Sequence, residues 1–124
     1  MLHTKFVEPT GLNAQNISTA EDVARMIDAA SKTPRIAAIG KKFMYTMRSV
    51  ARRPRTHTIK STNKLLLSGA DVTLGKTGFI DTSGYNFTVV GQSPYGTRRT
   101  VVVLNAPTLA ASFQIAGKYV SMAN

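Results

Sequence analysis

The sequence predicts an α+β fold, an antiparallel β-sheet with helices packed on it. Three apolar segments in the C-terminal half are separated by turn-forming residues, which is the pattern of a β-meander. Segments with helical apolar spacing and a capping residue precede and follow them. The 124 residues are enough for one domain, and a hydrophobic content of 43% supports a modest core.

The first helix is predicted from a capping signal. Ser18 to Glu21 fits a capping box, with Ser18 as the N-cap and Glu21 reaching back from the third helical position. The helix should continue to about Ser31. Its buried stripe is expected to contain Val23, Met26, Ile27 and Ala30, with Met26 as a core residue.

A second, shorter helix should follow directly. Thr33 is the expected N-cap, and Pro34 suits the first helical position because its missing N–H would have no partner there. Ile36 and Ile39 are expected to face inward, and Gly40 to end the helix.

Residues 41–64 form a basic segment without acidic residues, in a chain of formal net charge +10. Phe43, Tyr45 and Met47 alternate like a half-buried strand, residues 52–55 read as a basic loop, and residues 56–60 read as a returning strand. The segment is either a solvated surface or a site for a polyanion such as nucleic acid, anionic lipid or an acidic polymer. Its basic residues are Lys41, Lys42, Arg48, Arg52, Arg53, Arg55, Lys60 and Lys64.

The sheet is expected to contain strands at residues 72–79, 85–91 and 98–104, joined by turns at 81–84 and 93–96. Phe87 and Val89 should share one face of the second strand. Pro107 stops the third strand, and Thr108 can cap a terminal helix. The buried face of that helix should contain Leu109, Ala110, Phe113, Ala116 and Val120.

Several functional classes find no support in the composition. The chain has no cysteine and only two distant histidines, so we expect no disulfide, no metal site and no cofactor. His57 reads as a surface residue. No apolar run reaches the roughly 18 residues that a membrane-spanning helix needs, and no signal-peptide pattern opens the chain.

The tripeptide Lys76-Thr77-Gly78 can carry chemistry at a strand edge. Lys76 offers a cation to a substrate carboxylate, and the Thr77 hydroxyl offers a hydrogen bond to the same group. Gly78 has no side chain, so a bound peptide can approach the strand closely. The tripeptide is short, and its simpler interpretation is a lysine at a strand end followed by a turn glycine.

Several blocks in register extend this signal. They are Phe6-x-x-Pro-x-Gly-Leu12, Thr62-Asn63-x-Leu65-Leu66, Lys76-Thr77-Gly78-Phe79 and the apolar run 101–106. Together they resemble the D-alanyl-D-alanine carboxypeptidases and endopeptidases, the low-molecular-mass penicillin-binding proteins. The phenylalanine that follows the tripeptide, together with the residues before it, is most similar to the sequence of the endopeptidase branch of this family. The resemblance implies part of a β-lactamase/transpeptidase-like (DD-peptidase) fold.

The resemblance also implies a serine-type D-Ala-D-Ala peptidase that remodels peptidoglycan in the periplasm. It implies neither a cofactor nor a nucleic-acid partner. Lys76, Thr77 and Gly78 would bind substrate, and the Phe79 backbone N–H would be one of two oxyanion-hole donors. Stem peptides and β-lactams would be the partners. Two positions differ from the family pattern: Ile80 stands where threonine is frequent, and Asn86 where the endopeptidase branch often has cysteine.

The family places its Ser-x-x-Lys nucleophile and its Ser-x-Asn motif before the block that occupies Phe6 to Leu12 here. We therefore expect residues 1–124 to be the C-terminal portion of a catalytic domain, inactive alone. Ser61-Thr62-Asn63-Lys64 matches both motifs, but its register and the lack of a following amphipathic helix argue against a nucleophile. We expect Thr62 and Asn63 to brace a loop instead. The expected subdivisions are a helical segment 18–40, a basic segment 41–64, a sheet 72–105 and a terminal helix 108–122.

Two other interpretations stay open: a non-catalytic basic module that binds a polyanion, and a degenerate domain with only a packing role. If the chain is half of a catalytic domain, apolar sheet faces should be exposed and self-association is expected. The side chains concerned are Val72, Leu74, Phe87, Val89, Val101 and Val103.

Overall fold

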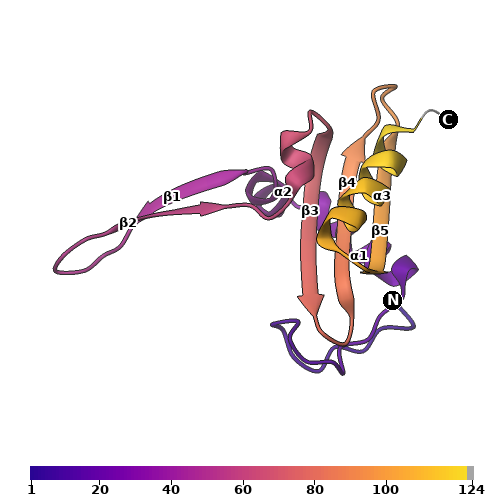
Figure 1. Ribbon diagram of the computed structural model, residues 1–124, viewed down its shortest axis with the longest axis horizontal. Coiled ribbons are helices and arrows are strands. Elements are labelled where there is room, and N and C mark those ends of the chain that lie inside the picture. The colour runs from indigo at the N-terminus through magenta and orange to yellow at the C-terminus, as the bar shows by residue number, and fades with distance from the viewer. Residues whose placement is uncertain (123–124) are drawn as a thin grey trace.

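The computed structural model describes residues 1–122 and has an antiparallel sheet at its centre (Figure 1). The strands β3 (Asp71–Ile80), β4 (Gly84–Gln92) and β5 (Arg98–Ala106) pair in the order β3-β4-β5. This confirms the predicted meander and the α+β class. The other elements are α1 (Ala20–Ser31), α2 (Pro34–Gly40), β1 (Met44–Arg48), β2 (Thr56–Lys60), the 3₁₀ helix η1 (Lys64–Leu67) and α3 (Leu109–Ser121).

Helices cover both faces of the sheet. α3 packs on the face where Phe87 meets Phe113 edge-on, with ring centroids 4.8 Å apart. α1 packs on the opposite face, where Ile27 contacts Leu74 and Val90. Because side chains alternate along a strand, Val89 and Val90 are both fully buried, each in a different layer.

The sheet's apolar side chains are therefore not the exposed surface that the sequence suggested. Val72, Leu74, Phe87, Val89 and Val103 are buried, and Val101 is partly buried. The chain's own α1 and α3 cover them.

The exposed apolar side chains lie elsewhere. Ile36 and Ile39 of α2 were expected to face inward, but 43% and 70% of their surfaces are exposed. α2 instead approaches β3 through Gly40, where an added Cβ would lie 2.2 Å from a Leu74 methyl carbon. Met26 is also exposed rather than a core residue.

The first helix begins one residue later than predicted. Thr19, not Ser18, is the N-cap, and its hydroxyl accepts a hydrogen bond from the Asp22 N–H at 3.2 Å. Ser18 instead bonds the Thr4 hydroxyl at 2.8 Å. Glu21 does not reach back to the cap but pairs with Arg25 one turn later.

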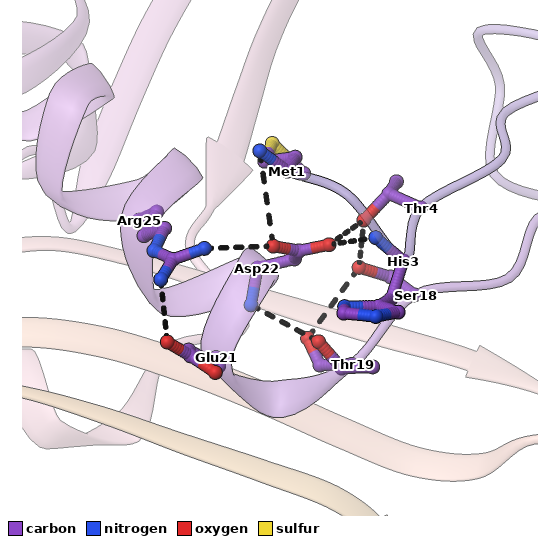
Figure 2. Close-up of polar contacts among 8 residues, drawn as sticks. All are labelled: Met1, His3, Thr4, Ser18, Thr19, Glu21, Asp22 and Arg25. Carbon is purple, nitrogen blue, oxygen red and sulfur yellow. Dashed lines mark hydrogen bonds and ion pairs between the residues drawn. The ribbon is translucent and has the colours of Figure 1, made fainter.

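Asp22 ties the N-terminal segment to α1, as Figure 2 shows. Its carboxylate is buried and accepts hydrogen bonds from the His3 N–H at 2.9 Å and the Thr4 hydroxyl at 2.8 Å. The guanidinium group of Arg25, on the same helix, lies 3.4 Å from the Asp22 carboxylate. The hydrogen bond from Thr4 lowers the pKa of Asp22 most; burial opposes it, and the His3 N–H, the chain's amino terminus and Arg25 lower it further.

Asp22→Asn should destabilise the chain near neutral pH, and the loss should shrink in acid. A carboxyl whose pKa is lowered by folding stabilises the fold above its ordinary pKa of about 3.9, and this contribution disappears as the pH falls through the lowered value. Urea midpoints of parent and variant between pH 7 and pH 3 measure the difference. Asp81→Asn, in an exposed turn, is the matched control. A gap between parent and Asp22→Asn that stays constant over this range would contradict the account.

The strands β1 and β2 form a hairpin that projects from the body (Figure 1). All ten of their residues are exposed, and among the described elements each strand packs only against the other. The expected strand is present as β1, but it is more exposed than predicted, with 51% of Tyr45 and 40% of Met47 accessible; Phe43, just before it, is partly buried. The alternation that suggested burial reflects the two faces of a free hairpin.

The predicted cap of the terminal helix is confirmed. The Thr108 hydroxyl accepts a hydrogen bond from the Ala111 N–H at 3.0 Å. Ala110, expected in the buried face, is exposed, and Ser112 is buried in that face instead. Ser112 satisfies its hydroxyl by donating to the Leu109 carbonyl at 2.7 Å, so a polar side chain fits the core.

Candidate functional site

A hollow of about 620 Å³ lies at the free edge of β3. Its walls are the loop from Pro9 to Leu12, the α1 side chains Val23 and Met26, and the ends of β3 and β4. Lys76, Thr77, Gly78 and Phe79 all line it. The structure therefore brings the four site residues predicted from the sequence to one concave surface.

These four residues alternate between the two faces of β3. Leu74 packs toward α1, so Lys76 and Gly78, two and four residues later, lie on the same face. Thr77 and Phe79 lie on the other face, opposite Phe87 and Tyr85 of β4. Because β3 is an edge strand, a hollow that touches both sets of side chains passes around the strand's free edge.

Lys76 is the one charged side chain among the residues that line this hollow. It is exposed, and its ammonium group donates to the neighbouring Thr77 carbonyl. Within residues 1–122 no carboxylate forms an ion pair with it. The hollow therefore carries a positive charge that is free to attract an anion.

Thr77 is braced by the segment that precedes β3. Its hydroxyl lies 2.7 Å from the Thr62 hydroxyl, and either group can donate. The buried Asn63 accepts from the Leu65 N–H at 3.1 Å and so caps η1. Its amide nitrogen packs against Gly75, where an added Cβ would lie 2.4 Å away. This agrees with the bracing role predicted for Thr62 and Asn63.

Gly78 leaves the strand edge open. A Cβ added there would meet nothing closer than the Asn86 Cβ at 4.0 Å, so the space beside this residue is unfilled. The next residue, Phe79, stacks on Tyr85 with ring centroids 4.4 Å apart, yet half of its surface stays exposed. The side-chain space at Gly78 and Phe79 thus leaves room for an extended ligand beside the strand.

Ser61 and Lys64 do not form a nucleophile–base pair. The Ser61 hydroxyl accepts from the Asn63 N–H at 3.2 Å, and Ser61 does not line the hollow. The residues after it form the four-residue η1, not an amphipathic α-helix. His57 lies on the exposed hairpin, away from the hollow. The described residues also contain no group of three or more potential metal ligands.

A sequence model of the D-alanyl-D-alanine carboxypeptidase family matches residues 1–108. The chain belongs to this family. It is 30% identical over 125 residues to a D-alanyl-D-alanine endopeptidase of Escherichia coli and 32% identical over 112 residues to one of Pseudomonas aeruginosa. The alignments cover 100% and 86% of this chain but 37% and 34% of those relatives.

The fold of this chain also matches that of solved structures. The DD-transpeptidase of Streptomyces K15 superposes with a TM-score of 0.78 at 28% identity, over 86% of this chain and 41% of that one. A penicillin-binding protein homolog from Mycobacterium tuberculosis shares the fold with a TM-score of 0.74 at 22% identity, over 96% and 48% of the two chains. The chain thus spans about a third of its curated relatives and less than half of these structures.

Glu8 shapes one wall of the hollow in this family member, and sequence reasoning missed it. Its carboxylate accepts hydrogen bonds from the Thr10, Gly11 and Asn13 N–H groups and from the Asn16 side chain. Hydrogen bonding, led by the Thr10 hydroxyl, lowers the pKa of Glu8 to about 2. A carboxylate followed within five residues by turn-forming Pro, Thr, Gly and Asn was the available signal.

Asn86, where the endopeptidase branch often has cysteine, has a structural role. Its amide donates to the Ser83 hydroxyl at 2.9 Å, and its carbonyl accepts from the Asn105 N–H at 3.0 Å. Asn105 has a positive φ of 54°, a conformation that asparagine tolerates well. The hydrogen bond between Asn86 and Asn105 stabilises the β4–β5 register at the irregularity between Tyr85 and Phe87.

Proposed function

We propose that this chain forms the substrate-binding part of a serine-type D-Ala-D-Ala carboxypeptidase or endopeptidase that remodels peptidoglycan. One observation carries the proposal: in a member of this family, Lys76 is the single charge in a hollow at an open strand edge, beside Thr77 and Gly78. A lone cation with an adjacent hydroxyl and room beside the strand suits an extended peptide that ends in a carboxylate.

In the proposed mechanism the peptide lies along the edge of β3. Lys76 binds its terminal carboxylate, and the Thr77 hydroxyl, held by Thr62, donates a hydrogen bond to the same group. A serine attacks the carbonyl of the D-Ala-D-Ala bond, and the Phe79 N–H stabilises the oxyanion that forms. When this bond breaks, D-alanine leaves as the amine and takes up the proton that the serine lost; in a cross-link the serine instead attacks the D-alanyl carbonyl, and the amine of the neighbouring stem peptide leaves. Water then hydrolyses the acyl-enzyme and frees the serine.

The serine and its lysine base belong to a segment outside residues 1–124 in this proposal. Within residues 1–122, Ser61 is the serine in a Ser-x-x-Lys match, and its environment lacks the base and the helix that the chemistry needs. The chain alone would therefore bind substrate weakly and turn none over. Peptidoglycan stem peptides and β-lactams are its proposed ligands, and the periplasm its proposed location.

Incubation with benzylpenicillin should leave the mass of the isolated chain unchanged, because no activated serine is present. Intact-mass spectrometry measures this directly. The same chain joined to a segment that carries the Ser-x-x-Lys and Ser-x-Asn motifs should gain one penicilloyl group on the serine of that segment. An adduct on Ser61 of the isolated chain would overturn the assignment, and so would a joined protein that folds but takes up no penicillin.

A further inference from the structure

Positive charge is concentrated on the hairpin and its base. Eight of the 16 basic residues and none of the six acidic residues lie in residues 41–64. The other 100 residues balance eight basic against six acidic side chains. The molecule is therefore nearly neutral apart from one projecting element, which Figure 1 shows extending away from the sheet.

None of the ion pairs among the described residues involves a basic side chain of residues 41–64. The carboxylates in the described ion pairs are those of Glu21, Asp22 and Asp28, and none of them pairs with residues 41–64. Lys42 alone has a described charge contact, 4.9 Å above the Tyr45 ring. Arg52, Arg53 and Arg55 are exposed in the loop at the tip. Folding has not used these charges, so they are available to an anionic partner.

The hairpin also exposes apolar side chains in an ordered way. In the β1–β2 register, Tyr45 pairs with Ile59 and Met47 with His57, and these four share one face. Tyr45 and Ile59 are 51% and 54% exposed. Together with Ile39 and Phe43 they line an apolar hollow at the hairpin's base. The opposite face carries Met44, Thr46, Arg48, Thr56, Thr58 and Lys60.

Val50 extends this apolar surface to the tip. Its side chain is completely exposed, and basic residues flank it closely in the sequence, at Arg48, Arg52 and Arg53. An exposed valine between arginines places an apolar group and several cations in the loop that joins β1 to β2. This combination is typical of elements that lie in the interface of an anionic membrane.

We propose that the β1–β2 hairpin docks on the surface of a bilayer that contains anionic phospholipids. The arginines at the tip contact the lipid phosphates, while Val50 and the face with Tyr45, Met47 and Ile59 enter the headgroup region. Long basic side chains suit this position because their aliphatic stems lie against apolar surface while the charge stays hydrated. Nucleic acid would use the charges but gain nothing from an exposed valine, methionine and isoleucine.

Vesicle flotation tests this proposal, because aggregated protein stays at the bottom of the gradient. The chain should float with vesicles of phosphatidylcholine and phosphatidylglycerol at 0.1 M salt. It should not float with phosphatidylcholine alone, and binding should weaken at 0.5 M salt. Arg52→Gln with Arg53→Gln should weaken binding about 25-fold, at about fivefold for each basic residue. Lys5→Gln with Lys118→Gln removes the same charge from other surfaces and should change binding less than twofold.

Val50→Ser separates a lipid surface from a general polyanion, because it leaves the charge unchanged. It should weaken vesicle binding about three- to tenfold and leave binding to a short DNA duplex unaltered. Circular dichroism spectra that match the parent show that each variant is folded. Equal losses in the two double variants, or a Val50→Ser variant that binds vesicles like the parent, would overturn the proposal. Flotation with phosphatidylcholine alone would also overturn it.

Discussion

Lys76→Ala should slow acylation by benzylpenicillin about 30- to 1,000-fold in a protein that joins this chain to the nucleophile-bearing segment. The range corresponds to a loss of about 2–4 kcal/mol, as expected when a charge-assisted donor to the substrate is removed from a catalytic site. Lys76 is the only charge that lines the hollow of the described chain, so no neighbouring cation is available to replace it. Stopped-flow acylation rates at substrate concentrations below saturation measure the effect.

Two variants serve as controls for this experiment. Lys64→Ala removes the lysine of the Ser61-Thr62-Asn63-Lys64 match, and His57→Ala removes a residue of the exposed hairpin. Both should acylate within about twofold of the parent. Acylation of Lys76→Ala at the parent rate, or a larger loss in Lys64→Ala, would mean that the carboxylate is bound elsewhere.

Phe87→Ala should have the largest effect on stability, a loss of about 3–5 kcal/mol of unfolding free energy. Phe87 is 1% exposed, lies in the central strand and meets Phe113 of α3 edge-on. Removing its ring opens a cavity between the sheet and α3, and a domain of this size has only about 5–15 kcal/mol in total. Urea denaturation monitored by circular dichroism measures the change.

Phe6→Ala is the matched control, because the same side chain is removed from a position that is 56% exposed. We expect a change of about 0.5 kcal/mol or less there. If the two variants lost equal stability, the layer between the sheet and α3 would not be the main core of this chain.

The sequence predicted the parts of the fold that depend on local signals. The three strands, the turn at Ser93–Gly96 and the Thr108 cap each follow from neighbouring residues, and each is present. The Thr19 cap was missed by one position because Ser18 and Thr19 are both good caps. The Thr4 hydroxyl, which bonds Ser18, comes from 14 residues earlier in the chain.

Burial was harder to predict because it depends on which element covers which. Periodicity alone predicted an inward face for Ile36, Ile39, Tyr45 and Met47, but between 40% and 70% of each remains exposed. The sheet was expected to expose apolar side chains, but α1 and α3 of the same chain cover its two faces.

Part of the candidate site was also visible only in three dimensions. Lys76, Thr77, Gly78 and Phe79 were recognised as a motif, and the structure places them around one hollow. The Thr62–Thr77 contact joins residues 15 positions apart. The turn-forming residues after Glu8 indicate a turn, but only the structure shows that the Glu8 carboxylate accepts hydrogen bonds from the backbone N–H groups of this wall. Such contacts are set by the path of the chain rather than by local composition.

The carboxylate-binding role of Lys76, Thr77 and Gly78 is tested most directly by an NMR titration of the isolated ¹⁵N-labelled chain. The ligand is diacetyl-Lys-D-Ala-D-Ala, and the control is the same peptide with a C-terminal amide, which lacks the carboxylate. The free acid should shift the amide resonances of residues 76–79 and of Thr10, Gly11 and Leu12 in the facing loop, with weak affinity. The amide peptide should not shift them, and Lys76→Met should abolish the shifts while Lys118→Met keeps them. Equal shifts with both peptides, or shifts that survive in Lys76→Met, would contradict the central claim.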